Sequence, residues 1–231
     1  MATELFKRTL TGLGFTTATL IVFLLLHHFP VQDFPVGAWL ILGAFLIPPT
    51  FIALWEWKEL RIAFFSEFEW FVIGAIYLFG SSAIIAYFMA YEPWIALWLM
   101  SVPVAADTGA YFAGKKYGKT QIFPVTSPKK TYEGAVGGAI SAFAISFLFY
   151  WFGKVSIFEL LATVAIFPAS VAGDYFFSYL KRASGKKDAG SSLPGHGGFV
   201  DRFDSHFLSN WTYFILIGVS KLTALVTYWL W

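Results

Sequence analysis

The sequence predicts an all-α fold, a polytopic integral membrane bundle of about seven transmembrane helices. Composition is the first reason: of 231 residues, 58% are hydrophobic and only 13% are charged, whereas soluble domains carry about 25% charged residues. The mean hydropathy of +0.65 agrees with this. The second reason is that apolar runs close to the ~20 residues needed to cross the hydrocarbon core recur along the chain. An ordinary soluble domain is therefore excluded.

Seven apolar runs can be placed in order, and each is expected to form a transmembrane helix. They are Leu10–Phe29, Val36–Trp55, Trp70–Ala90, Trp94–Tyr111, Gly134–Phe152, Phe158–Leu180 and Phe207–Trp231. The first run follows two basic residues, as in a signal peptide, but no Ala-x-Ala-like cleavage site ends it, so we expect an uncleaved span. The fourth run is the weakest, because Pro103 interrupts it and Asp107 enters it.

Basic residues mark alternate connections between these runs. They are Lys7 with Arg8, Lys58 with Arg61, the segment Lys115–Lys130 and the segment Lys181–Lys187. The positive-inside rule then predicts a cytoplasmic N-terminus and two large basic loops that face the cytoplasm. The expected location is the cell (inner) membrane. Tryptophans near the ends of the runs, such as Trp55, Trp57 and Trp70, are expected in the interfacial belts.

Composition also limits the partners and ligands. The net charge of +2 comes from short basic blocks, which argues against nucleic acid as a partner. The chain has no cysteine, so any metal must be held by oxygen or imidazole ligands. No linker is long enough to separate two domains. Residues 1–231 are therefore expected to form one membrane-embedded domain, with N-terminal spans up to about residue 92 and a catalytic half at about 93–231.

Asp174 is the first candidate functional residue, since it lies inside the sixth apolar run. An aspartate at the centre of a membrane helix costs roughly 2.5 to 3.5 kcal/mol on translocon scales, so it needs a partner. At helical spacing Ser170, Asp174 and Ser178 share one face, with Lys181 close to the same line. A structural hydrogen bond or ion pair inside the bundle would explain this stripe, but the carboxylates of the following loop favour a functional role.

Asp107 repeats this pattern in the fourth run, followed at helical spacing by Tyr111 and Lys115. A helix cap or an ion pair would also explain it. The segment after it combines glycines, lysines and hydroxyls before a helix expected near Glu133, and backbone amides at a helix N-terminus favour phosphate. The segment lacks the residue order of a Walker A motif. A positive-inside anchor on anionic lipid would explain the lysines, but not Ser127-Pro128 or the glycines.

The second basic loop contains the densest set of reactive side chains. Its turn Pro194-Gly195-His196-Gly197-Gly198 can bend tightly and let the backbone approach a ligand. Asp201 and Asp204 follow at a spacing that puts both on one face of a helical turn. Two such carboxylates suit Mg²⁺, which is commonly shared with substrate phosphates. His196 is either a general base or a residue that hydrogen-bonds the turn in place.

The second loop and its flanks form one long and specific pattern, which consists of Ser178-x-Leu-Lys-Arg, Lys187-Asp188 and Leu193-Pro-Gly-His-Gly-Gly-Phe-Val-Asp-Arg-Phe-Asp204. This pattern resembles the signature of phosphatidate cytidylyltransferases, also called CDP-diacylglycerol synthases. Two upstream segments also resemble this family: Asp107-Thr-Gly-Ala-Tyr-Phe-Ala-Gly-Lys-Lys-Tyr-Gly-Lys and Ser127-Pro-Lys-Lys-Thr-Tyr-Glu-Gly. The likeness covers most of the C-terminal half. The N-terminal spans are similar only in character, with Glu56-Trp57 a weak further similarity.

The resemblance implies that CTP and phosphatidate are converted to CDP-diacylglycerol and pyrophosphate, a reaction of phospholipid biosynthesis. It implies Mg²⁺ as the cofactor, often beside a monovalent cation such as K⁺, and a metal pair held by Asp174 and Asp201. A homodimer surrounded by membrane lipid is also expected. The chain is shorter than typical bacterial members of the family and is expected to lack one or two of their N-terminal spans.

This chemistry assigns the polar residues of the loops to three roles. The catalytic residues are expected to be Asp174, Lys181, Arg182, Lys187, Asp188 and Arg202. Asp188 and Asp204 are expected to join Asp174 and Asp201 at the metal or beside it. Substrate binding is assigned to Asp107, Tyr111, Lys115, Ser127, Pro128, Lys129, Lys130, Thr131, Gly134, Ser178, His196, Gly197 and Gly198. The residues expected to contact phosphates are Lys129, Lys130, Lys181, Arg182, Lys187 and Arg202. Asp107, Ser127 and the neighbouring glycines are expected on the nucleotide side.

Two alternative functions stay open at this point. The first is a relative that uses CTP on another lipid, either as a kinase, which releases CDP, or as a different cytidylyltransferase, which releases pyrophosphate. The second is an anion transporter with a gate made of the same basic loops, and Pro103 and Pro168 are compatible with its broken helices. The crowding of carboxylates on one side of the membrane favours a metal site over a translocation path.

Overall fold

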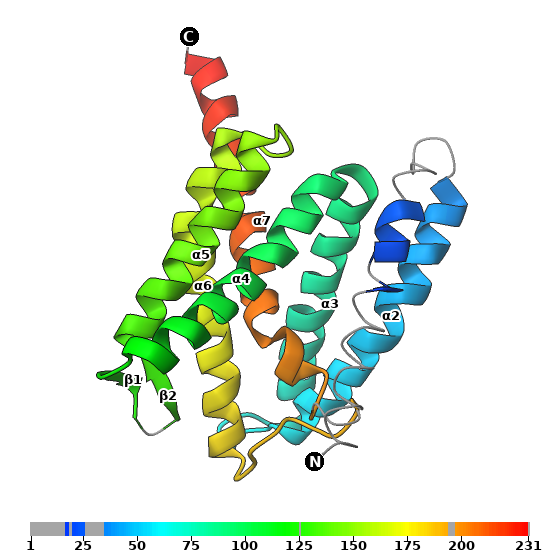
Figure 1. Cartoon of the computed structure of the whole chain (residues 1–231). Helices are drawn as coiled ribbons and strands as arrows, with labels where there is room; N and C mark the ends of the chain where they lie inside the picture. Colours follow the sequence, from blue (N-terminus) through cyan, green and yellow to red (C-terminus); the bar gives the residue numbers. More distant parts are fainter. Residues whose placement is uncertain (1–16, 19, 26–34, 125, 194–196, 231) are drawn as a thin grey trace. The chain divides into compact units, whose positions relative to one another are not determined.

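The structure, a computed structural model, describes residues 17–18, 20–25, 35–124, 126–193 and 197–230. It is mostly helical (79%), as the sequence predicted (Figure 1). In chain order its elements are α2 (Pro35–Glu59), α3 (Glu67–Tyr91), α4 (Pro93–Tyr117), β1 (Gln121–Phe123), β2 (Ser127–Thr131), α5 (Tyr132–Trp151), α6 (Ile157–Ala183) and α7 (Val200–Leu230). The chain divides into two compact units. Unit 1 comprises Met1–Leu97 and Asp174–Asp204, and unit 2 comprises Trp98–Gly173 and Ser205–Trp231.

Six of the predicted apolar runs coincide with α2 to α7. In the described part of the chain, five helices are long and apolar enough to cross a membrane, namely α2 from Ala38 onward, α3, α4, α5 and α6. The polytopic helical character is therefore supported. The first predicted run, Leu10–Phe29, lies in large part outside the described residues. The count of about seven spans, the cytoplasmic N-terminus and the single domain stay predictions.

Helix α4 continues through both features that made the fourth run the weakest. Pro103 removes one backbone donor, which membrane helices tolerate because neighbouring groups satisfy the freed carbonyl. Among the candidate spans found in the described residues, α4 has the lowest mean hydropathy, as expected. The helix ends at Tyr117 and not near Tyr111. Asp107 and Lys115 therefore lie on the same helix.

In unit 1, α2 and α3 pack side by side (Figure 1) and are joined by a pair of tryptophans. The rings of Trp57 and Trp70 stack with their centroids 4.5 Å apart. Each indole N–H donates to the backbone carbonyl of the other residue, at 2.8 Å from Trp57 and 2.9 Å from Trp70. Both residues are buried, with exposed fractions of 1% and 3%. Each indole therefore finds its acceptor inside the unit, and the expectation that both residues lie at the level of an interfacial belt stays a prediction.

In unit 2, the part of α4 after Trp98 packs closely against α5 through small residues. A Cβ added to Gly109 would collide with Ser141 and with the Gly137 carbonyl, and one added to Gly137 would collide with Ala113. Small residues at such positions let two helix backbones approach each other in a membrane protein. The helix that carries Asp107 is therefore held against the beginning of α5.

The connection between α4 and α5 contains a short antiparallel hairpin, which the all-α prediction did not include. Gln121 of β1 lies opposite Thr131 of β2, and Phe123 lies opposite Ser127. Strand β2 is polar and does not alternate between buried and exposed residues, so the periodicity that identifies a strand is missing from its sequence. We refer to residues 118–131 as the basic hairpin.

Candidate active site

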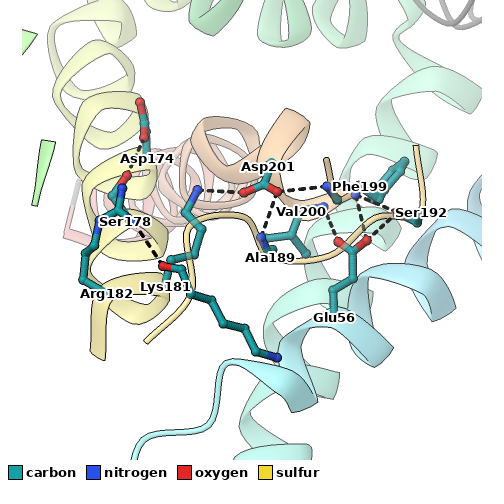
Figure 2. A network of polar contacts seen from close by, with 12 residues as sticks. Glu56, Asp174, Ser178, Lys181, Arg182, Ala189, Ser192, Phe199, Val200 and Asp201 are labelled. Atoms are coloured by element: carbon teal, nitrogen blue, oxygen red, sulfur yellow. Dashed lines mark hydrogen bonds and ion pairs between the residues drawn. The ribbon is translucent and has the colours of Figure 1, made fainter. Parts of the chain in front are cut away.

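Two oppositely charged residues meet where α6 ends and α7 begins. Lys181 Nζ lies 2.7 Å from Asp201 Oδ1, and the two side chains are only 12% and 6% exposed (Figure 2). Lys181 is in the last turn of α6 and Asp201 is in the first turn of α7, where a cation and an anion respectively complement the helix dipoles. Removing one member of such a pair leaves an uncompensated buried charge. A residue predicted for phosphate and one predicted for metal are thus in direct contact.

The carboxylate of Asp201 also organises the α6–α7 loop, residues 184–199. Its Oδ2 accepts hydrogen bonds from the backbone N–H of Ala189 at 2.8 Å and of Gly198 at 2.9 Å. Within the loop, the Leu193 N–H donates to the Gly197 carbonyl at 2.9 Å. Two separate segments of the loop are therefore hydrogen-bonded to the Asp201 side chain.

Two glycines allow the loop backbone to come this close. Gly197 has a φ of +82°, in the left-handed region that glycine adopts without steric cost. A Cβ added to Gly198 would lie 2.6 Å from Glu56 Oε2 and 2.7 Å from the Gly190 nitrogen, so a side chain there would displace the loop. Both glycines were predicted to let the backbone approach a ligand. In the structure they let it approach carboxylates of the protein itself, and their contact with substrate stays a prediction.

Glu56 on α2 is a site residue to which sequence reasoning assigned no role. It is 3% exposed, and its carboxylate accepts hydrogen bonds from Phe199 N at 3.0 Å, from Val200 N at 2.8 Å and from the Ser192 hydroxyl (Figure 2). These partners are 136 to 144 residues away along the chain. No local motif could identify them. The available signal was a carboxylate at the edge of an apolar run, which indicates a partner inside the protein.

Asp174 lies on α6 with the partner that its sequence position led us to expect. The Ser178 hydroxyl, one helical turn away, donates to Asp174 Oδ1 at 3.2 Å. Arg182 Nη1 donates to the Lys186 carbonyl at 3.1 Å, which satisfies a backbone acceptor just beyond the end of α6. Asp174, Ser178 and Arg182 therefore lie on the same helix as Lys181, and each has contacts within the protein (Figure 2).

The acidic oxygens of unit 1 match the preference of a hard cation such as Mg²⁺. Asp188 and Asp201 both lie against Gly197, because a Cβ added there would be 3.7 Å from the Asp188 carboxyl carbon and 3.1 Å from Asp201 Oδ2. Of the roughly four lone-pair sites on a carboxylate, Asp201 uses three for protein donors. Among the described residues, no group of three or more His, Asp or Glu is arranged to hold a metal. The donors fit Mg²⁺ chemically, provided that substrate phosphate or water completes the shell.

The other residues predicted for this site differ in exposure. Asp204 is buried on α7, at 8% exposed, whereas Arg202 is exposed on the same helix. Lys187 and Asp188 are exposed on the loop. His196 lies outside the described residues. The structure therefore gives both a buried charged pair and exposed charged residues in this part of the chain.

A pocket of about 530 Å³ lies between α2 and the α6–α7 loop of unit 1. Trp55 and Glu56 line it from α2, and Asp188 and Ser192 line it from the loop. Its volume is within the range of small-molecule sites. Asp188, predicted to be catalytic, therefore borders a space large enough for part of a substrate.

The predicted substrate-binding residues between Asp107 and Gly134 belong to unit 2, and most of them are exposed. Asp107, Tyr111 and Lys115 are exposed on α4, and Lys115 Nζ lies 5.7 Å from the centroid of the Tyr111 ring. Four more predicted residues lie on β2: Ser127, Pro128, Lys129 and Lys130. Of these, Pro128 and Lys129 are exposed, and the other two are half-buried.

Two residues predicted for substrate binding have structural contacts at the start of α5. Thr131 is the N-cap, and its Oγ1 accepts a hydrogen bond from Gly134 N at 3.1 Å. Gly134 is buried, and a Cβ there would lie 3.0 Å from the Ala110 carbonyl. Glu133 accepts a hydrogen bond from Lys119 N at 3.0 Å. These contacts fix the backbone of the basic hairpin, and substrate binding by Thr131 and Gly134 stays a prediction.

Comparison with known proteins gives one matching family and several similar enzymes. The sequence profile of the cytidylyltransferase family matches residues 2–220. A phosphatidate cytidylyltransferase of Helicobacter pylori (strain J99) is 48% identical over 112 residues, 47% of this chain and 41% of that protein. The enzyme of the same name from Haemophilus influenzae is 37% identical over 134 residues, 53% of this chain and 46% of that protein. That of Bacillus subtilis is 41% identical over 116 residues, 48% of this chain and 43% of that protein. The chain thus spans less than half the length of these relatives.

Proposed function

Because this chain belongs to the cytidylyltransferase family, we propose that it transfers CMP from CTP to phosphatidate and releases pyrophosphate. The similar proteins named phosphatidate cytidylyltransferase support this substrate pair. The observation that carries the proposal is the buried contact between Lys181 and Asp201 at 2.7 Å, which joins the two helices that flank the loop with Lys187 and Asp188. It supports a site for phosphate groups and the cation that accompanies them.

The reaction requires positioning and charge neutralisation more than a strong base. A phosphate monoester has a second pKa near ~6, so the lipid phosphate is largely dianionic at neutral pH and is already a nucleophile. Its oxygen forms a bond to the α-phosphorus of CTP. The bond from that phosphorus to the oxygen bridging to the β-phosphorus breaks, and the electron pair leaves with pyrophosphate. Two polyanions must approach each other, so cationic groups lower the barrier.

The residues of unit 1 supply these charges in our proposal. Lys181, Arg182, Lys187 and Arg202 bind phosphate oxygens. Asp174 and Asp201 hold Mg²⁺, with Asp188 and Asp204 as further or outer ligands. When bound, the metal polarises phosphoryl oxygens and neutralises charge that develops in the transition state. A monovalent cation such as K⁺ beside it is part of the proposal.

The residues of unit 2 hold the nucleotide in this proposal. Exposed lysines of the basic hairpin, such as Lys129, attract the triphosphate. Asp107, Tyr111 and Lys115 on α4 and Ser127 on β2 complete the nucleotide side. The contacts of Thr131 and Gly134 support this role indirectly, since they fix the backbone on which the lysines are presented.

We further propose the topology inferred from the sequence. About seven spans place the N-terminus and both basic loops in the cytoplasm, where CTP is available, and the protein is a homodimer of the cell (inner) membrane. The alternating basic connections support the orientation. The candidate spans found in the described residues support a multi-pass protein.

Product analysis with two labelled nucleotides tests the proposal. Purified protein in detergent is incubated with phosphatidate, Mg²⁺ and CTP labelled with ³²P at either the α- or the γ-phosphate. We expect α-label to enter the lipid fraction and γ-label to appear in pyrophosphate, with no transfer when phosphatidate is omitted. Entry of γ-label into lipid would instead identify a CTP-dependent lipid kinase. Absence of both products would contradict the proposed function.

A further inference from the structure

Glu56 joins α2 to the loop that carries the predicted active-site residues. Its Oε1 accepts hydrogen bonds from Phe199 N and Ser192 Oγ, and its Oε2 accepts one from Val200 N. All these residues belong to unit 1. Glu56 is 3% exposed, so its carboxylate is compensated by these donors and not by solvent.

The donors that Glu56 satisfies are those at the beginning of α7. The first backbone N–H groups of a helix have no partner within the helix, and they attract negative charge. A local Ser, Thr, Asp or Asn usually fills this role, but here Phe199 precedes the helix. The cap comes instead from another helix. Because Asp201 is in the first turn of α7, the position of this turn is set by contacts from α2.

The close packing of the loop around Glu56 also supports the conclusion that α2 sets the position of the first turn of α7. A Cβ added to Gly190 or to Gly198 would lie 2.7 Å or 2.6 Å from an oxygen of the Glu56 carboxylate. The loop therefore closes around this side chain on two sides. Gly198 N in turn donates to Asp201 Oδ2. The same glycine therefore lies against the Glu56 carboxylate and donates a hydrogen bond that orients Asp201.

Helix α2 is itself fixed next to Glu56. The neighbouring Trp57 exchanges two hydrogen bonds with Trp70 of α3 and stacks on its ring. Trp57 also contacts Phe177 of α6 edge-on, with ring centroids 5.9 Å apart. Glu56 is thus held by a buried aromatic cluster, and a helix assigned only to the N-terminal spans contributes to the site.

We propose that Glu56 is a positioning residue: it caps α7 from α2 and thereby fixes Asp201 and Lys181 in the arrangement that binds phosphate and its cation. The role in catalysis rests on the proposed function, whereas the role in fixing the loop does not. Glu56 contacts no reacting atom in this account. It acts through the backbone of residues 198–200.

Glu56→Gln is the informative variant, because it keeps the size of the side chain but replaces one acceptor oxygen by an NH₂ group that faces a backbone N–H. Glu67→Gln, the same change at an exposed carboxylate of unit 1, is the matched control. Tyr213→Phe, which removes a buried hydrogen bond to Glu159 at 2.9 Å, controls for a general loss of stability. Ser192→Ala removes one donor to Glu56 and serves if Glu56→Gln does not fold.

Hydrogen–deuterium exchange reports on the loop without requiring activity. In Glu56→Gln we expect the amides of residues 197–203 to exchange roughly tenfold faster or more, as expected when hydrogen bonds to a charged group are lost. Ser192→Ala should shift the same amides in the same direction by less. Glu67→Gln and Tyr213→Phe should leave the pattern of this segment as in the wild type.

The kinetic readout separates positioning from stability. We expect Glu56→Gln to raise the Mg²⁺ concentration for half-maximal turnover, or to lower kcat, by roughly 10- to 100-fold, the effect typical of residues that orient metal ligands. Tyr213→Phe should lower thermal stability without changing the Mg²⁺ requirement. Wild-type exchange at residues 197–203 in Glu56→Gln would overturn the proposal, and faster exchange with both wild-type kcat and wild-type Mg²⁺ dependence would overturn its catalytic part. If the wild type labels no lipid, the proposed function fails, and exchange still decides whether Glu56 fixes the loop.

Discussion

The α6–α7 loop of unit 1 and the basic hairpin of unit 2 both carry lysines, but they hold them differently. In the loop region, Lys181 is paired with Asp201 and both side chains are largely buried. In the hairpin, Lys129 is exposed, and the contacts at Thr131 and Glu133 fix the backbone beneath it. One region fixes the charged groups themselves, and the other fixes only the backbone that carries them.

This difference indicates different contributions to one reaction. Buried, preorganised charges act strongly on a developing charge because little solvent screens them and they need no reorganisation. Exposed charges attract a polyanion over a distance but are screened by salt. We therefore expect the α6–α7 loop to determine turnover and the hairpin to determine nucleotide affinity.

Replacement of Lys181 should give a larger effect than the three substitutions that follow it here. Lys181→Met keeps most of the side-chain volume but leaves the Asp201 carboxylate without its cation. We expect kcat to fall roughly 100- to 1,000-fold, as when one preorganised donor is removed from an active site. Label transfer from α-³²P-CTP to lipid measures it. Lys58→Met on α2 is the control. A fall in kcat of less than tenfold in Lys181→Met would contradict the proposed difference between the buried charged pair and the exposed lysines of the hairpin.

A methyl group at Gly198 should have the next largest effect. In Gly198→Ala the added Cβ would lie within 2.6 Å of Glu56 and 2.7 Å of the Gly190 nitrogen, so the loop must move. We expect turnover to fall roughly 10- to 100-fold, as for residues that orient ligands indirectly. Gly218→Ala on α7 should stay active, because apart from its chain neighbours and its own helix backbone no atom of the described residues lies within 4 Å of the added Cβ. Equal activity of the two variants would show that the loop is not closely held.

Replacement of a lysine in the basic hairpin should have a smaller effect, and this effect should depend on the salt concentration. Lys129→Ala should raise the KM for CTP roughly fivefold and leave kcat unchanged, because an exposed charge contributes modestly to binding. The difference from the wild type should shrink as ionic strength rises. Lys221→Ala, at an exposed lysine of α7, provides the comparison. A loss of kcat in Lys129→Ala would assign the hairpin to the chemical step.

The N-cap of α5 should affect stability more than activity. Thr131→Ala removes the side-chain acceptor for Gly134 N and should cost about 1 kcal/mol of unfolding free energy, the usual value for an N-cap. Thermal unfolding in detergent measures this. Thr223→Ala, whose hydroxyl donates to carbonyls of its own helix, should change stability less. Equal losses of thermal stability in the two variants would contradict a stabilising role of the Thr131 cap.

Much of the fold was predictable because apolar runs of the length of a membrane identify helices directly. The ends were less predictable: α4 passes through Pro103 and reaches Tyr117, since a proline in a membrane helix need not end it. The hairpin was missed because β2 lacks the alternation of a half-buried strand.

The site was predictable only where its residues are close in sequence. Asp174, Lys181 and Asp201 could be selected because charge is rare in apolar helices and the loop pattern is long. Glu56 could not be assigned to the loop, because its partners are up to 144 residues away and only the packing of α2 brings them together. Gly198 was selected for approach to a ligand, whereas its contact with Glu56 required the structure.

The most direct test of the central role of the α6–α7 loop is a Mg²⁺ titration of lipid labelling by the wild type and by Asp201→Asn. Asparagine keeps the shape of the side chain but removes the charge paired with Lys181. We expect turnover to fall roughly 100- to 1,000-fold at saturating Mg²⁺, with a further loss at limiting Mg²⁺. Undiminished turnover at limiting Mg²⁺ would contradict the assignment of Asp201 and, with it, the location of the active site in this loop.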